Sequence, residues 1–384
     1  MSYTNDVFPL GKIVPSIDVV DRHSFIKESK MRLMHGNSIM ISGPRRIGKS
    51  SVAHEIMRQL QNDGCYVVKL DLMYTSTIEE FATKLIQSIL ENRTGVLPHV
   101  SSAIQQLRNF FQNSELHAKI NDLELGITLD AQSSPTELLE TAFHMAETMA
   151  KKDDKRMVIL LDEFQELDRL DQMGKSSGQS LLKRLRSIFQ QQEHTTYFFL
   201  GSESSLLNTI FAERNQAFYR FTTLLQLPSI PEGEWKTYIQ YKLRAENIQM
   251  TDSAIRMLME RTGGHPYCVM SIMANAYFAA KISDMNEINA KVLDRSYNQS
   301  LSQLDAVYEE QWQEIRRFKG ADLVLRSILL NKPIHNKEAG TSNVTRSVKN
   351  LMRLSVIEKG DSRGEYRLLE PMFGDWILKN IQER

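Results

Sequence analysis

The stretch that decides the fold is Gly43-Pro44-Arg45-Arg46-Ile47-Gly48-Lys49-Ser50. It matches the phosphate-binding pattern G-x-x-x-x-G-K-[ST] at every fixed position. The apolar run at 38–42 predicts a buried strand before the motif, and residues 51–58 begin a helical pattern after it. Strand, glycine loop and helix are the context in which this pattern forms a site. We therefore favour a phosphate-binding loop (P-loop) over a chance match in an ordinary strand-to-helix turn.

The residue types of this loop suit a polyphosphate. Gly43 and Gly48 let backbone N–H groups turn towards phosphate oxygens, and the following helix presents its positive end to the same anion. Lys49 would bring a charge to the β- and γ-phosphates, and the Ser50 hydroxyl can ligate Mg²⁺. We predict that the whole loop lines a nucleotide site, including Pro44, Arg45, Arg46, Ile47 and Ser51.

A second motif supplies two carboxylates. Five apolar residues, Met157 to Leu161, run directly into Asp162 and Glu163. A strand that is buried on both faces need not alternate, and ligands bind at the carboxyl ends of parallel strands. We predict that Asp162 helps Ser50 to hold Mg²⁺ and that Glu163 polarises the attacking water. The alternative is a strand followed by two solvated acids, and the P-loop upstream makes it less attractive.

Three further stretches, 66–71, 196–202 and 222–227, predict strands of the same sheet. Together with the two strands above they give an α/β core with a five-stranded parallel sheet over residues 1–230. Residues 92–135 contain an alternating polar stretch at 117–125 that predicts a hairpin inserted into this core, without a functional motif.

The rest of the chain predicts two smaller domains. Residues 231–318 have an almost continuous helical pattern, interrupted at Thr262-Gly263-Gly264-His265-Pro266-Tyr267. We expect Gly264 to end one helix in the left-handed conformation and Pro266 to begin the next. This break is at least a tight turn between helices, and a functional interpretation places it over the nucleotide base. Residues 319–384 predict helices followed by a hairpin around 360–364, which favours a winged helix.

Composition limits the classes of partner. The 384 residues contain 47 Lys and Arg and 47 Asp and Glu, so no global field attracts nucleic acid or a membrane. Two cysteines, Cys65 and Cys268, lie in apolar surroundings, which argues for a reducing compartment. The apolar runs are too short to cross a bilayer, and the first residues lack a signal-peptide plan. We expect a cytoplasmic protein that makes no membrane contact.

These motifs together resemble the AAA+-type P-loop ATPases of the STAND class (signal-transduction ATPases with numerous domains), and they are most similar to the archaeal-ATPase family. The 162–165 stretch, Asp-Glu-Phe-Gln, is similar to the family's Walker B motif. The turn around Pro266 resembles its lid motif, with proline in place of a sensor-two arginine. Four residues, Val19-Val20-Asp21-Arg22, resemble the N-terminal box that touches adenine, although His23 and Ser24 replace its usual acids.

The resemblance implies a function as well as a fold. Its ligands would be ATP and Mg²⁺, and its chemistry ATP hydrolysis, with Lys49 and Glu163 in catalytic roles. Ser202 is similar to the family's sensor residue for the γ-phosphate, and Arg220 stands where such proteins carry an arginine-finger-like residue. The resemblance further implies a homo-oligomer on ATP binding and a molecular switch that regulates a partner of unknown identity, often in defence or signalling.

Two other functions stay open. Arg346, Lys349 and Arg353 could face the phosphates of duplex DNA while Arg363 occupies the tip of the wing, as in an initiator-like or transposition-regulator-like ATPase. A winged helix that packs on protein, with solvated basic residues, explains the same pattern. A P-loop kinase for a small molecule is the third possibility, but Glu163 and the lid motif suit water better as the acceptor.

Overall fold

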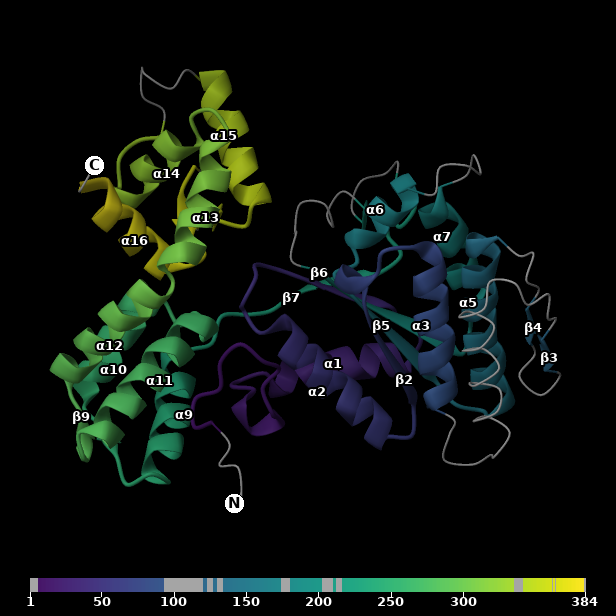
Figure 1. Cartoon of the computed structure of the whole chain (residues 1–384), viewed down its shortest axis with the longest axis horizontal. Coiled ribbons are helices and arrows are strands. Elements are labelled where there is room, and N and C mark those ends of the chain that lie inside the picture. The colour runs from purple at the N-terminus through teal and green to yellow at the C-terminus, as the bar shows by residue number, and fades with distance from the viewer. Residues whose placement is uncertain are drawn as a thin grey trace.

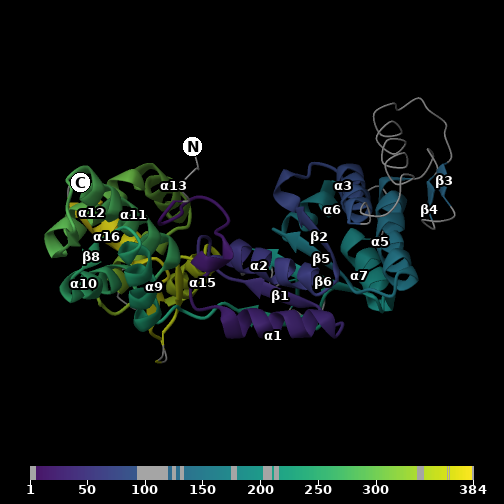
Figure 2. The ribbon, with the colours of Figure 1, turned by 90° about the horizontal axis from the view of Figure 1, so that it is seen from below.

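The computed structural model describes most of the chain. The described residues are 6–92, 120–122, 127–129, 134–173, 180–201, 210–211, 216–334, 341–360, 362 and 364–382. Figures 1 and 2 both show two parts side by side: a sheet flanked by helices, and a mainly helical part that continues to the C-terminal end. None of the helices in the described part of the chain is long and apolar enough to span a membrane.

Five parallel strands form the central sheet in the order β2-β5-β6-β1-β7. Their bounds are Ile39–Ser42 (β1), Tyr66–Asp71 (β2), Met157–Asp162 (β5), Thr195–Gly201 (β6) and Thr223–Gln226 (β7). Every strand lies within one residue of its predicted ends, because buried strands carry a strong local signal of apolar and β-branched residues. β1, which leads into the P-loop, lies between β6 and the edge strand β7, so the loop emerges at the carboxyl edge one strand in from the end of the sheet.

Helices cover both faces of the sheet. Those of the core are His23–Met34 (α1), Lys49–Asn62 (α2), Ile78–Glu91 (α3), Pro135–Lys152 (α5), Glu166–Met173 (α6) and Leu181–Gln191 (α7). One hydrophobic cluster joins α1 and α2 to the sheet, and another joins α3, α5 and α7 to its other face. Local chemistry sets the ends of these helices: at α5, Ser134 and Glu137 form a capping box and Pro135 is the first helical residue.

The insert contains a short hairpin. Ile120–Asp122 (β3) pairs antiparallel with Ile127–Leu129 (β4), so the hairpin predicted within this insert is present and extends beyond residue 125. Two short 3₁₀ helices complete the core, at Ser16–Asp18 (η1) and Leu72–Tyr74 (η2).

Residues 231–318, called the lid region below, are mainly helical, as predicted, with one addition. Its elements are Glu232–Arg244 (α9), Gln249–Met250 (β8), Asp252–Thr262 (α10), Pro266–Ile282 (α11), Glu287–Ile288 (β9), Ala290–Gln303 (α12) and Asp305–Arg316 (α13). The two-residue strands β8 and β9 pair in parallel, a feature too short to show any periodicity in the sequence. Gly263, not Gly264, ends α10: its φ is 56° and its N–H bonds the Met259 carbonyl at 2.8 Å, which closes the last turn one residue earlier than expected. Gly264 follows, also left-handed, and Pro266 begins α11 as predicted.

The C-terminal block consists of three helices and a hairpin. Its elements are Ala321–Leu329 (α14), Thr341–Arg353 (α15), Ile357–Lys359 (β10), Tyr366–Leu368 (β11) and Pro371–Gln382 (α16). β10 and β11 pair antiparallel around the predicted turn, and Arg363, the expected wing tip, lies outside the described residues.

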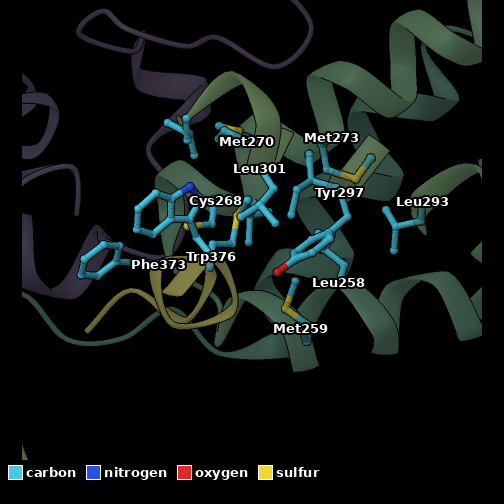
Figure 3. Packing of buried hydrophobic residues seen from close by; sticks show 14 of the residues in the cluster. Leu258, Met259, Cys268, Met270, Met273, Leu293, Tyr297, Leu301, Phe373 and Trp376 are labelled. Carbon is cyan, nitrogen blue, oxygen red and sulfur yellow. The ribbon is translucent and has the colours of Figure 1, made fainter. Parts of the chain in front are cut away.

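Lid and C-terminal block share one hydrophobic core. The cluster runs from Phe8 through the lid helices into α16, where Phe373 and Trp376 lie against lid residues such as Cys268 (Figure 3). The ring centroids of Tyr308 and Phe373 are 5.2 Å apart, and the Trp376 indole donates to Asp305 Oδ1 at 2.8 Å. Because burial of large aromatic side chains stabilises such contacts strongly, these two regions are expected to move together.

Candidate active site

The P-loop forms the tight turn that the sequence predicts. Gly43 has a φ of 156°, which L side chains rarely adopt, and a Cβ built on it would lie 2.7 Å from Ile47 Cδ1, so that the Ile47 side chain would have to shift. Gly48 has a φ of 93° and is the N-cap of α2. Since glycine has no side chain with which to cap the helix, the first N–H groups of α2 are left for an anion.

Lys49 is buried beneath this loop. The residue is 7% exposed, and its Nζ donates to the carbonyl oxygens of Gly43 at 2.8 Å and of Pro44 at 2.6 Å. Burial lowers the pKa of the ammonium to about 8, although the charges of Glu163 and Asp162 oppose the effect. The ammonium is therefore held by neutral carbonyl oxygens, and a phosphate oxygen would be a much stronger partner.

Ser50 and Asp162 come together from distant parts of the chain. The Ser50 hydroxyl donates to Asp162 Oδ2 at 3.3 Å, and the backbone N–H of Glu163 donates to Oδ1 at 2.9 Å. Burial raises the pKa of Asp162 above its ordinary value, and the charges of Glu163 and Asp71 raise it further. Asp71, which the sequence reasoning missed, is the residue directly opposite Asp162 in the β2–β5 pairing. A hydroxyl beside a carboxylate is a set of hard oxygen donors that suits Mg²⁺.

Glu163 is held by its neighbours. Its φ is 50°, and Gln165 donates its side-chain N–H to Glu163 Oε2. The next residue, Phe164, is fully buried, and its N–H bonds the Leu200 carbonyl on β6 at 2.9 Å. Gln165 thus belongs to this site, although no sequence motif indicated a role for it.

Positive φ angles mark several of the predicted site residues. In the described chain nine residues other than glycine have positive φ, and four of them are Asp21, Arg46, Glu163 and Arg220. Asn and Asp tolerate this conformation, but longer side chains adopt it rarely, at a cost of about 1–3 kcal/mol. Such residues are often found at functional sites, where the surrounding structure compensates for the strain.

The P-loop touches the lid through Arg46. The centre of its guanidinium lies 4.7 Å from the centroid of the Tyr267 ring, one residue after Pro266. The turn itself is tightly packed, since Trp235 donates its indole N–H to the Gly264 carbonyl at 3.0 Å. The predicted P-loop and lid motifs are thus in direct contact.

The N-terminal box lies where core and lid meet. Val20 packs against the cluster of the lid, and the buried Arg22 donates Nη1 to the Pro228 carbonyl. Just before the box, the buried Asp18 accepts hydrogen bonds from Tyr238 OH at 2.8 Å and Lys242 Nζ at 2.7 Å. Nothing in the sequence pattern indicated that Asp18 would link the N-terminal segment to the lid.

One predicted residue lies away from this cluster, and another falls outside the described residues. Arg220 precedes β7, whose first residue, Thr223, pairs with Ile39 at the amino end of β1. It therefore lies at the opposite edge of the sheet from the P-loop, with an exposed side chain whose guanidinium is 5.2 Å from the Tyr219 ring centroid. Ser202 lies outside the described residues.

Comparison with known proteins places this site in a family. Residues 19–272, more than half of the chain, match the model of a family described as an ATPase domain predominantly from Archaea. The chain belongs to this family. No curated protein matches the sequence.

Solved structures share the fold of this family member at low sequence identity. The Walker-type ATPase PABY2304 of Pyrococcus abyssi is 17% identical, with a TM-score of 0.70 over 97% of this chain and 99% of its own. The ORC2 protein of Aeropyrum pernix, solved as ADPNP and ADP complexes, is 13% identical, with a TM-score of 0.58 over 99% and 98%. The prediction of an α/β fold with a five-stranded parallel sheet is confirmed, and membership of an ATPase family confirms the prediction of ATP hydrolysis.

Proposed function

We propose that this ATPase is a nucleotide-controlled switch of the STAND class, which regulates a protein partner in the cytoplasm. ATP would draw the lid (231–318) against the core (1–230), and the C-terminal winged helix (319–384) would follow the lid. The observation that carries the proposal is the contact between Arg46 of the P-loop and Tyr267 of the lid. A cation that holds the lid and also lines the phosphate site must respond to a bound polyphosphate, because the phosphates compete for its charge.

The lid contacts extend from Tyr267 to the C-terminal block. Glu370, directly before α16, accepts hydrogen bonds from Tyr308 OH and from Cys268 Sγ, the latter at 3.7 Å. On the other side of the lid turn, a Cβ built on Gly263 would lie 3.4 Å from Pro371 Cγ. One turn therefore touches both the P-loop and the start of α16, which supports a lid and winged helix that move as a unit.

We propose that Mg²⁺ binds with the nucleotide at Ser50 and Asp162. The described residues contain no group of three or more His, Cys, Asp or Glu side chains that could hold a metal ion, so phosphate and water oxygens would complete the ligand set. The bound ion would neutralise charge that develops on the phosphates. Lys49 would bind the β- and γ-phosphates, and Glu163 would take a proton from the attacking water.

An assembly is part of this proposal. Because Arg220 lies at the edge of the sheet away from its own P-loop, it would serve only a neighbouring subunit, where its exposed guanidinium could stabilise the transition state. We therefore propose a homo-oligomer that forms when ATP binds.

Fluorescence energy transfer between two introduced cysteines tests the movement. The labels would be placed by Gln61→Cys on α2 of the core and Gln299→Cys on α12 of the lid, because both glutamines are exposed. The two native cysteines are buried and should resist labelling. We expect the transfer efficiency to change when a non-hydrolysable ATP analogue with Mg²⁺ is added, and not in the Lys49→Ala variant. Identical efficiencies in both nucleotide states, at saturation, would contradict the switch.

The Arg46–Tyr267 contact has its own variant. Tyr267→Leu removes the ring and keeps an apolar side chain, so it should change the resting transfer efficiency or its response to nucleotide. Tyr241→Leu, which alters an exposed tyrosine on α9, is the matched control and should leave both unchanged.

A second function, binding of duplex DNA, is favoured by one observation. Arg346, Lys349 and Arg353 are all exposed along one face of α15. Residues 319–384 also contain 12 Lys and Arg against 8 Asp and Glu, within a chain whose formal charge is zero.

Fluorescence anisotropy with labelled duplex DNA at several salt concentrations separates this function from the switch. If α15 binds DNA, the affinity should fall steeply as the salt concentration rises. In the triple alanine variant of Arg346, Lys349 and Arg353, the affinity should depend less steeply on salt concentration. The control is Lys379→Ala on α16. No binding at low salt would leave the protein-regulating switch alone.

A further inference from the structure

Gln165 is a buried amide whose environment does not explain its presence. The residue is 6% exposed, and its side-chain N–H donates to Glu163 Oε2. Its carbonyl oxygen, Oε1, has no hydrogen-bond partner among the described residues. A buried acceptor without a partner costs about 1–3 kcal/mol, so a Leu or Met at this position would suit packing alone better.

The carboxylate fixes which way the amide points. If the amide were reversed, Oε1 would face the oxygen of Glu163 and repel it, while the N–H₂ group would lose its acceptor. The amide N–H₂ group, which has a hydrogen-bond acceptor, therefore faces Glu163, and Oε1, which has no partner among the described residues, points away from it. This asymmetry indicates that contact with Glu163 is the reason for the amide.

The backbone around Glu163 is pinned on both sides. The N–H of Glu163 bonds Asp162 Oδ1 at 2.9 Å, and the N–H of Phe164 bonds the Leu200 carbonyl at 2.9 Å. The Phe164 ring is locked among aromatic neighbours, with its centroid 4.5 Å from that of Phe199. The side chain of Glu163 is only partly buried, and Gln165 contacts its carboxylate directly.

We infer that Gln165 is a positioning residue for ATP hydrolysis, which holds the Glu163 carboxylate in the orientation needed to receive a proton from water. The inference rests on the proposed role of Glu163 as the base. Since Gln165 would act only through that carboxylate, its removal affects the chemical step and leaves nucleotide binding intact. A misplacement of about 1 Å can cost on the order of 10²-fold in rate.

The test compares Gln165→Met, which keeps the length of the side chain and removes its donor, with wild type. We expect kcat to fall about tenfold or more, while KM and the affinity for a non-hydrolysable ATP analogue stay within a factor of two. The melting temperature should not fall, because the variant also removes the buried acceptor. Gln192→Met is the matched control: Gln192 is a structural amide that donates to the Phe143 carbonyl at 2.8 Å, so its loss should lower stability and leave kcat unchanged.

A double-mutant comparison separates this inference from the proposed function. In the Glu163→Gln background, Gln165→Met should cause no further loss, because the two residues act as one unit. An unchanged kcat in Gln165→Met, with the loss in Glu163→Gln intact, overturns the positioning role, and so does an equal additional fall in both backgrounds. If Glu163→Gln itself keeps full turnover, the proposed base is wrong before Gln165 is considered. Gln165→Leu replaces the methionine variant if the latter does not fold.

Discussion

Nucleotide binding should be coupled to a proton on Lys49. The pKa of this ammonium is about 8 in the free protein, because burial of the side chain disfavours its charge. A triphosphate with charges fixed above pH 7 would favour the protonated form and return the pKa towards 10.5. The pKa is then lower in the free state than in the bound state. Binding is at full strength well below pH 8, and it weakens as the pH rises through 8 towards 10.5.

The size of this effect follows from the two pKa values. Between pH 7 and pH 9.5 the affinity for nucleotide should fall about 30-fold, and at pH 9 binding should take up about 0.9 proton per site. Titration calorimetry with a non-hydrolysable ATP analogue, in two buffers of different ionisation enthalpy, measures both quantities.

The control for this experiment is Lys49→Ala. The variant should bind weakly, show no proton uptake between pH 8 and 10, and lose the stabilisation of about 2.7 kcal/mol that wild type gains at a hundredfold excess over its dissociation constant. An affinity that is flat from pH 7 to 9.5 in wild type, or a melting-temperature shift in the variant equal to that of wild type, would refute the reasoning.

The other predictions concern the reaction and its assembly. Glu163→Gln keeps its shape but loses the base, so turnover should fall about 10²-fold or more in a phosphate-release assay while ATP still binds; normal turnover would move the role elsewhere. Asp162→Ala should weaken both turnover and the Mg²⁺ dependence of binding, and an effect on turnover alone would count against a metal role. Arg220→Ala should bind ATP normally and hydrolyse it about 10³-fold more slowly, and mixing it with Glu163→Gln should restore some activity. A specific activity that is independent of protein concentration, with no rescue on mixing, would exclude action between subunits.

Much of the core could be predicted because its signals are local. Each strand of the sheet has four to seven residues that are mostly apolar, aromatic or β-branched, and each is recognisable without knowledge of its neighbours. The P-loop is equally local, because Gly43, Gly48, Lys49 and Ser50 all act within one turn of the backbone. The sequence could not distinguish Gly263 from Gly264 as the end of α10, since adjacent glycines adopt the left-handed conformation with equal ease.

The pairing of distant residues needed the tertiary structure. Ser50 and Asp162 are 112 residues apart and meet only because their strands lead to the same edge of the sheet. The contact between Arg46 and Tyr267, and the burial of Gln165 behind Glu163, have no sequence pattern at all.

The sequence by itself therefore determined which elements form and which residues can hold phosphate. Short-range geometry and hydrophobic periodicity are enough for that, because they act within a few residues of one another. Only the tertiary structure decided that Arg220 lies across the sheet from its own P-loop, and that lid and C-terminal block share one core. These relations depend on strand order and on side-chain packing between elements. Both are set by long-range burial, which local sequence does not encode.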